Sequence, residues 1–326
     1  MDLSFSLESF RSVDAEWQDI LACSDHSSIF LTPYWQGAWW ESMGADGQEL
    51  RIVKFTDGES TVGIAPLMKD GGLITFLGST DLWDMHDFIV VRGREHDFYR
   101  GFMEYLEGEE WSEVRLESVP EASHTLSHLP TLAAERGRRV EQVEEDTLMG
   151  VSLPGTWDEY LMGLRKKDRH ELRRKLRRLG EAVDYRIYRL SDANDVADAM
   201  DDFLDLMGQS REEKSRFLTD ERYTFFRDMS PRMAELGLLH LFFLEVEGVR
   251  TAATVCFDYN NVWYLYNSGH NTDYAALGTS FLLKAMCIQD AIGEGKAYFD
   301  LLRGTEQYKY HLGATGRGLY TLSILR

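Results

Sequence analysis

The chain has 326 residues, of which 44% are hydrophobic, and it carries a formal net charge of -20. This length exceeds that of one compact core, so we expect two domains of roughly 150 residues each. The negative charge argues against a general nucleic-acid or anionic-membrane binder, because most of the surface would repel phosphate groups. No stretch of the sequence approaches the roughly 18 unbroken apolar residues of a membrane span.

The N-terminal segment, residues 1–17, has neither the basic start nor the apolar run of a secretory signal. Three scattered cysteines, Cys23, Cys256 and Cys287, are too few for a disulfide framework or a zinc site. We therefore expect a cytoplasmic protein with reduced thiols and no bound metal. The sequence leaves its oligomeric state open.

The first 150 residues alternate strand-like and helix-like patterns loosely. In chain order we expect a strand, two helices, four strands, a helix and a last strand, at residues 3–10, around Asp14, 32–43, 50–57, 60–69, 73–79, 86–91, 94–107 and 113–119. The second half follows a similar order with dissimilar residues, which indicates an old duplication.

Pro154 and Gly155 mark the clearest joint in the chain. Directly after them, Thr156 and Glu159 form a capping box that predicts the start of a helix. We therefore place the domain boundary near residue 150, with an N-terminal domain over 1–150 and a C-terminal domain over 151–326.

The helix expected over 156–179 has a narrow apolar stripe and an otherwise basic surface. Within it, residues 165–178 hold nine Lys or Arg against two acids, in a chain that is acidic elsewhere. A charge run is usually a solvated face, and part of this one could brace acidic neighbours. Its density also suits contact with a polyanionic ligand.

After this helix the patterns predict a strand, a helix that Ser191 can cap, a second helix from about Thr219 and an antiparallel meander of three strands. A helix from Gly278, a strand, a short helical turn and a final strand complete the chain. The expected bounds of the strands and of the short turn are 183–190, 238–246, 250–259, 261–269, 297–304, 305–313 and 318–326.

This order of strands and helices is that of the GNAT fold. The stretch 298–313, YFDLLRGTEQYKYHLG, resembles the signature of the FemAB-like branch of GNAT acyltransferases, which includes the CelD-type acetyltransferases. Residues 30–40, 63–68 and 76–90 and the basic helix resemble that branch in the right order. The resemblance implies an α+β chain of two tandem GNAT-like domains, each a mixed, mostly antiparallel sheet with flanking helices.

The resemblance also implies transfer of an acyl group from coenzyme A, or of an aminoacyl group from tRNA, to an amine. The expected acceptor is an amino sugar, an amino acid or a peptide-like molecule, in polysaccharide or cell-envelope synthesis. Relatives that use tRNA often carry a coiled-coil arm near the basic helix, where this chain has one helix, so acyl-CoA is the favoured donor. Two alternatives stay open: aminoacyl-tRNA-dependent transfer to a peptidoglycan precursor, and a catalytically silent GNAT pair that only binds.

Gly278, Thr279 and Ser280 open a helix directly after a strand and a loop. Backbone N–H groups at such a helix start suit the pyrophosphate of the donor. The alternative is that Gly278 turns the chain while Thr279 or Ser280 caps the helix. By resemblance, Arg303 belongs to the same donor site.

Lys309 is the leading catalytic residue by resemblance, preceded by Tyr308 in the short turn. Its positive charge would stabilise the donor or the oxyanion of acyl transfer. Asp300 would orient Lys309 or Arg303, or brace the fold. His270 has the ordinary pKa of a general base near neutrality. The alternative for Lys309 is a solvated side chain, and the alternative for His270 is a bystander side chain.

The acceptor side is expected in the first half, at Trp83, Asp84, His86 and Asp87, which combine an aromatic ring with acids and an imidazole. Tyr266 and Asn267 of the second half would also contact the acceptor. The alternative is a loop whose Trp83 caps the core and whose acids are solvated. The adjacent His86 and Asp87 lack a third spaced ligand, so we predict no metal there.

Overall fold

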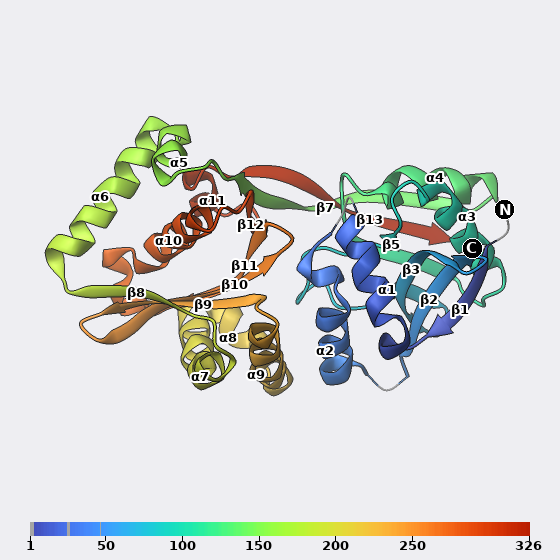
Figure 1. Ribbon diagram of the computed structural model, residues 1–326, viewed down its shortest axis with the longest axis horizontal. Helices are drawn as coiled ribbons and strands as arrows, with labels where there is room; N and C mark the ends of the chain where they lie inside the picture. Colours follow the sequence, from blue (N-terminus) through green and yellow to red (C-terminus); the bar gives the residue numbers. More distant parts are fainter. Residues whose placement is uncertain (1–2, 25–26, 46) are drawn as a thin grey trace. The chain divides into compact units, whose positions relative to one another are not determined.

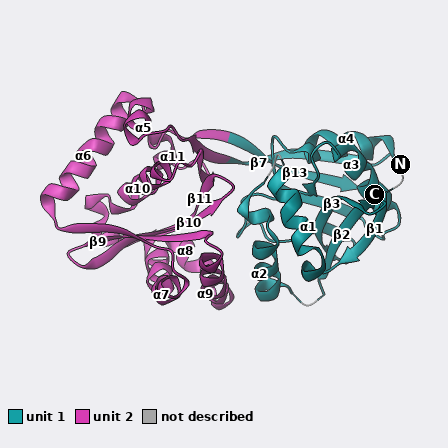
Figure 2. Cartoon of the chain, in the orientation of Figure 1, with its two compact units in different colours: residues 1–147, 317–326 teal, residues 148–316 magenta. Residues whose placement is uncertain are grey.

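The computed structural model describes residues 3–24, 27–45 and 47–326. The chain divides into two compact units (Figure 2), with Met1–Thr147 and Arg317–Arg326 in unit 1 and Leu148–Gly316 in unit 2. None of the helices in these ranges is both long and apolar enough to cross a membrane.

Unit 1 opens with β1 and two helices and continues with a sheet crossed by two more helices. Its elements are β1 (Ser4–Glu8), α1 (Phe10–Cys23), η1 (Ile29–Leu31), α2 (Pro33–Met43), β2 (Glu49–Asp57), β3 (Ser60–Asp70), β4 (Leu73–Phe76), β5 (Ile89–Val90), α3 (Glu95–Glu107), β6 (Glu113–Pro120) and α4 (His124–Glu135). β7 (Arg139–Ser152) leads from unit 1 into unit 2.

Unit 2 repeats this plan with longer helices. Its elements are α5 (Trp157–Gly163), α6 (Lys166–Ala182), β8 (Tyr185–Leu190), α7 (Ala193–Ser210), α8 (Glu212–Phe217), α9 (Asp220–Glu235), β9 (Leu239–Val246), β10 (Val249–Tyr259), β11 (Val262–His270), η2 (Thr272–Leu277), α10 (Thr279–Gly293), β12 (Tyr298–Arg303) and α11 (Gln307–His311). β13 (Thr315–Leu325) leads back into unit 1. Helices α7 and α9 lie on one face of the unit 2 sheet and α6 and α10 on the other (Figure 1).

The two sheets have the same topology. In unit 1 the order is β1-β2-β3-β4-β6-β13, and in unit 2 it is β8-β9-β10-β11-β12-β7. In each sheet the first four strands are antiparallel, the next pair is parallel over three residue pairs, and the last pair is antiparallel. The expected fold of two tandem GNAT-like α+β domains is confirmed, and the shared topology supports the duplication.

The C-terminal boundary differs from the expected one. Sequence reasoning placed residues 317–326 in the C-terminal domain, whereas the structure places them in unit 1. The reason is strand pairing, because β13 is antiparallel to β6, with Leu322 opposite Leu116 and Ile324 opposite Val114. All four of these side chains are buried in the unit 1 core.

The single helix expected over 156–179 is two helices. α5 ends at Gly163, Leu164 adopts an extended conformation, and α6 begins at Lys166 and runs past Gly180 to Ala182. The predicted capping box of Thr156 and Glu159 is present. Both helices turn leucines toward the unit 2 core, so the apolar stripe continues across the break.

Some local details differ from the prediction as well. Asp192, and not Ser191, caps α7, while Ser191 Oγ lies 2.8 Å from His240 Nδ1. Thr219 caps α9 as expected. The meander of β9, β10 and β11 is confirmed, with the β10–β11 turn at Asn260 and Asn261, both at positive φ as a tight hairpin requires.

Candidate active site

An opening lies at the carboxyl ends of the two parallel strands of unit 2. β11 and β12 pair over residues 262–264 and 298–300. Beyond these residues β11 continues along β10 to His270, and β12 bends through an irregular register against β7. The separation of neighbouring parallel strands at their carboxyl ends is a common place for a ligand in α/β sheets.

A bulge in β11 turns side chains toward this opening. Tyr266 is the extra residue, because Val255 pairs with Asn267 and Cys256 with Leu265. Before the bulge Leu265 packs in the core with α10, whereas Tyr266 contacts Phe226 of α9. An inserted residue reverses the alternation of a strand. Ser268 and His270 consequently line the cavity on the α10 side.

Helix α10 begins at this opening without a side-chain cap. Its N-cap is Gly278, which has the left-handed conformation with φ 69°, and neither Thr279 nor Ser280 caps the helix. The Thr279 hydroxyl is buried and has no hydrogen-bond partner in the described part of the chain. An uncapped helix start presents backbone N–H groups and a positive dipole end, which suit an anion.

These elements enclose a cavity of about 260 Å³ within unit 2. Five of the predicted residues line it: His270, Gly278, Thr279, Ser280 and Tyr308. Four charged residues that the sequence reading did not single out also line it: Arg211, Lys214, Lys284 and Glu306. The cavity therefore combines a helix N-terminus with three cationic side chains.

Lys214 is held by two hydrogen bonds. Its Nζ donates to Asn267 Oδ1 at 2.7 Å and to the carbonyl oxygen of Ser268. Burial, aided by the charges of Lys284 and Arg211 and opposed by Glu306, lowers the pKa of Lys214 to about 7. Lys214 is thus close to half-protonated at neutral pH.

Lys284 projects from α10 into the same cavity and is only 5% exposed. Its Nζ donates a 2.8 Å hydrogen bond to Ser280 Oγ and lies 5.2 Å from the centre of the Tyr308 ring. Burial lowers the pKa of Lys284 to about 8. Burial also raises the pKa of Tyr308, so this phenol stays protonated.

His270 lines the cavity at the end of β11. Burial lowers the pKa of His270, and the positive charges of Lys284, Lys214 and Arg211 act in the same direction. The imidazole is therefore neutral near pH 7, the state in which it can accept a proton.

Lys309 does not lie in the surroundings expected of it. Its side chain is buried, and its Nζ donates to the carbonyl oxygens of Leu302, Arg303 and Gly304 and pairs with Glu306 Oε2 at 3.0 Å. It does not line the cavity, so its charge is directed at the loop after β12 and not at an oxyanion. Lys309 instead shapes the loop that carries Glu306 and Tyr308.

Asp300 and Arg303 also serve this loop. Asp300 is buried, and its Oδ1 accepts a 2.8 Å hydrogen bond from the backbone N–H of Leu302. Arg303 ends β12 and lines neither the cavity nor the basic groove described next, which does not favour its predicted role in donor binding.

A second hollow, which we call the basic groove, follows α6 within unit 2 and has a volume of about 890 Å³. Five Lys or Arg and two acids line it, together with His170, His311 and Phe281: Lys167, Arg173, Arg174, Lys175, Arg177, Asp168 and Glu171. Phe281 lines the cavity as well. A Cβ atom on Gly278 would lie 3.5 Å from Lys175 Nζ, so the groove reaches the start of α10.

Asp168 anchors the groove to α11. Its carboxylate is buried, accepts a 2.6 Å hydrogen bond from Arg165 Nε and lies 2.7 Å from His311 Nδ1. Burial alone would raise the pKa of Asp168, but the hydrogen bonds from Arg165 and His311 outweigh it and hold the pKa below its ordinary value. The groove thus keeps a fixed carboxylate at one point of a cationic surface.

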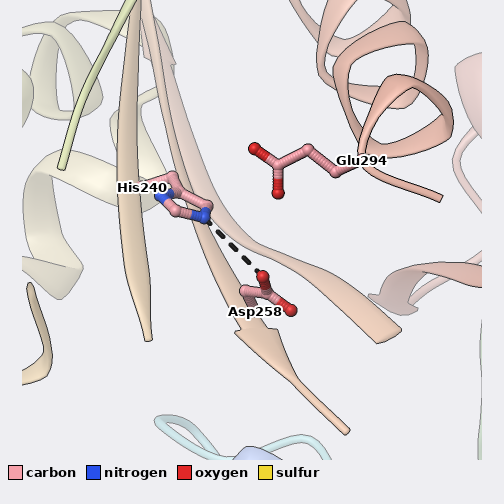
Figure 3. Close-up of side chains that lie close together, drawn as sticks. All are labelled: His240, Asp258 and Glu294. Atoms are coloured by element: carbon pink, nitrogen blue, oxygen red, sulfur yellow. Dashed lines mark ion pairs between the residues drawn. The ribbon is translucent and has the colours of Figure 1, made fainter. Parts of the chain in front are cut away.

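Figure 3 shows the group of three possible metal ligands that the described residues contain: His240 of β9, Asp258 of β10 and Glu294 after α10. Both carboxylates already have cationic partners. Lys296 Nζ lies 2.6 Å from Asp258 Oδ2, and Arg189 pairs with Glu294. Since a metal would have to displace both cations, we assign this cluster a bracing role between β8, β9, β10 and α10.

Three of the four acceptor residues predicted in unit 1 are buried and do not form an exposed acceptor site. Trp83 is fully buried, where it stacks on His86 and packs edge-on to Trp39, so it is no platform for a sugar ring. Asp87 is buried and accepts a 2.6 Å hydrogen bond from Thr125 Oγ1. Asp84 is partly exposed. His86 lines a hollow of about 380 Å³ in unit 1 together with Asp70, Arg115 and Glu117.

Comparisons with known proteins agree with this fold. The family model described as an acetyltransferase (GNAT) domain matches residues 166–310, which include the residues that line the cavity. No curated protein matches the chain.

Three solved structures are similar over nearly the whole chain. FemX has a TM-score of 0.67 at 11% identity and covers 98% of this chain and 96% of its own. The C-terminal domain of a putative lysylphosphatidylglycerol synthetase from Agrobacterium fabrum has a TM-score of 0.60 at 13% identity, over 98% and 92%. A tandem GNAT protein from the clavulanic acid biosynthesis pathway has a TM-score of 0.52 at 13% identity, over 98% of both chains.

The matched family model covers the unit that holds the cavity, and the solved structures share the two-unit fold. Residues 166–310, which make up most of unit 2, therefore match an acetyltransferase (GNAT) domain, and the chain has the two-unit fold of tandem GNAT proteins.

Proposed function

We propose that this enzyme transfers an acyl group from acyl-CoA to the amine of an amino sugar, an amino acid or a peptide-like acceptor. One observation carries the proposal: the cavity at the start of α10 and the basic groove share Phe281, so one donor can reach from the first to the second. Acyl-CoA has this form, with phosphates at one end and a thioester at the other.

The groove suits the phosphates of such a donor. It offers five Lys or Arg against two acids, in a chain of net charge -20. Because most of the surface repels anions, a polyanionic donor is attracted to this one face. Lys175 beside Gly278 adds its charge to the N-terminal end of α10.

The cavity suits the acyl group and the amine. The uncapped start of α10 presents backbone N–H groups to the cavity, which Lys284 also lines. Both would stabilise the negative charge that develops on the carbonyl oxygen in the tetrahedral intermediate. His270 and Lys214 supply neutral nitrogen bases near pH 7. Tyr308, whose pKa is raised by burial, keeps a proton that it can donate to a leaving thiolate.

A second candidate donor is aminoacyl-tRNA. The structural similarity to FemX and the open basic groove support it, because an RNA end would also place phosphates on α6.

A thermal-shift panel separates the two donors. Acetyl-CoA and longer acyl-CoA thioesters at about 100 times their Kd should add roughly 2.7 kcal/mol of stability, whereas charged tRNA should add none. Mass spectrometry of mixtures with glucosamine and other primary amines then identifies the acylated product. If only charged tRNA stabilises the protein, aminoacyl-tRNA replaces acyl-CoA as the proposed donor. If thioesters stabilise the protein but no acylated product forms, the chain is a binding protein and not a transferase.

A further inference from the structure

We infer that Lys214 is the general base that takes the proton from the acceptor ammonium in this cavity. The inference rests on the proposed acyl transfer and names a residue that neither the sequence signature nor the fold assigns. Lys214 lies on α8, a six-residue helix between α7 and α9, and its side chain lines the cavity beside the start of α10.

The hydrogen bonds of Lys214 fit a neutral amine. A neutral lysine has two N–H donors and one lone pair. The structure supplies two acceptors, Asn267 Oδ1 at 2.7 Å and the carbonyl oxygen of Ser268. When both N–H groups are used in this way, the lone pair is left for a proton from a molecule in the cavity. Asn267 therefore fixes the base and does not bind the acceptor directly.

The charges that face Lys214 from the neighbouring elements also favour its neutral form. The cations are Arg211, which precedes α8, and Lys284 of α10, and Glu306 before α11 is the acid that opposes them. His270 at the end of β11 also faces the cavity and is neutral near pH 7. Burial together with these cations brings the pKa of Lys214 to about 7. An alkyl ammonium acceptor is protonated at this pH, so a base that titrates near pH 7 is well matched to it.

The transfer balances with Lys214 in this role. Lys214 takes one proton from the acceptor ammonium, and the freed amine attacks the thioester carbonyl carbon. When the C–N bond has formed and the C–S bond breaks, the second proton of the attacking nitrogen passes to the departing thiolate. The products are the amide and the free thiol, and Lys214 then returns its proton to water.

The ionisation of Lys214 can be measured on the full chain without any acceptor. Trace labelling of lysines with acetic anhydride between pH 5 and 10, followed by peptide mass spectrometry, reports the neutral fraction of each amine. Lys214 should reach half-labelling near pH 7. If half-labelling of Lys214 requires a pH near the ordinary lysine pKa of about 10.4, the proposal fails.

The role of Lys214 is tested with acetyl-CoA and two amines of different basicity. Glucosamine is cationic at neutral pH, whereas 4-aminobenzoate already has a neutral amine. Lys214→Met should lower kcat for glucosamine by about 100-fold and abolish its rise through pH 7, with little change for 4-aminobenzoate. Lys214→Arg should behave like Lys214→Met, because a guanidinium stays protonated. Lys54→Met is the matched control and should leave both rates unchanged.

Equal losses with the two amines would show that Lys214 binds or supports the site without acting as the base. If Lys214→Met keeps the wild-type pH profile and His270→Gln loses it, His270 is the base and the proposal is overturned. Failure of the proposed function looks different, because the wild-type chain would then neither bind acetyl-CoA nor acylate either amine.

Discussion

Lys309 Nζ donates a 3.1 Å hydrogen bond to the carbonyl oxygen of Leu302, a buried residue that the fold holds at a φ of 60°. A positive φ is unfavourable for leucine, so the surrounding bonds must stabilise it. The same ammonium also bonds the carbonyl oxygens of Arg303 and Gly304. One lysine therefore stabilises the turn that follows β12.

Lys309→Met should destabilise the protein by roughly 2–4 kcal/mol, because it leaves three carbonyl groups and Glu306 without their buried partner. Urea unfolding measures the change. Activity should fall along with stability, since Tyr308 lies on the same loop. An enzyme of wild-type stability that has lost only turnover would restore the catalytic role that the sequence suggested.

Lys284→Met should stabilise the protein while it lowers activity. The folded state holds the pKa of Lys284 near 8, so below pH 8 it carries a buried charge that the unfolded chain places in water. A shift from 10.5 to about 8 at about 1.4 kcal/mol for each pKa unit means that removing this charge should add roughly 3 kcal/mol at pH 7. The difference in free energy of unfolding between the variant and the wild type should shrink as the pH rises from 8 toward 10.5, because Lys284 of the folded wild type is then neutral.

Urea unfolding of both proteins at pH 7 and pH 9.5 measures this difference. A constant gap would mean that the packing of the methionine, and not the charge of Lys284, sets the change.

Lys175→Glu should weaken binding of acetyl-CoA by about tenfold, which corresponds to about 1.4 kcal/mol. Lys175 lies beside Gly278 at the start of α10, so the reversal places a negative charge where the donor phosphates are expected. Isothermal titration calorimetry gives the Kd, and the effect should diminish in 1 M salt. Arg139→Glu, on the exposed part of β7 in unit 1, is the matched control. Similar losses in both variants would point to net charge alone.

Gly269→Ala should destabilise the protein by about 1–3 kcal/mol, because a Cβ atom there would lie 2.2 Å from the backbone nitrogen of Met207. The contact would push α7 away from the strand that carries Ser268 and His270, so activity should fall too. Gly293→Ala is the control, since nothing lies within 4 Å of its Cβ position at the end of α10. Thermal unfolding measures both variants, and a wild-type Tm for Gly269→Ala would contradict the close packing.

The spacing of apolar residues predicted the helices and strands that have one buried face and one exposed face. The face of α7 that carries Val196, Met200, Phe203, Leu204 and Met207 is buried as the spacing indicated. β7 was missed because most of its first half is exposed and carries charged residues that break the alternation. α4 and α8 were missed as well, and α8 has no buried residue to produce a pattern.

The helix start at the cavity was predicted because it depends on local sequence. Gly278, Thr279 and Ser280 open a helix at the cavity, as their position after a strand and loop indicated. Lys214 and Lys284 could not be singled out, because one lies in a polar run and the other in an apolar helix, and their chemistry comes from burial that only the tertiary fold creates. Lys309 was identified by resemblance, but a sequence motif does not show which way an ammonium points.

The pairing of β13 with β6 has a consequence for synthesis of the chain. Residue 114 meets residue 324 in the sheet of unit 1, so the partner strand is synthesised only after the whole of unit 2. Until then the edge of β6 has exposed backbone groups, which invite pairing with other chains. The corresponding strand of unit 2 is β7, which pairs with β12 and is synthesised before the rest of that unit. The second unit can therefore mature first, and a nascent chain that stops early would leave the first unit open to aggregation.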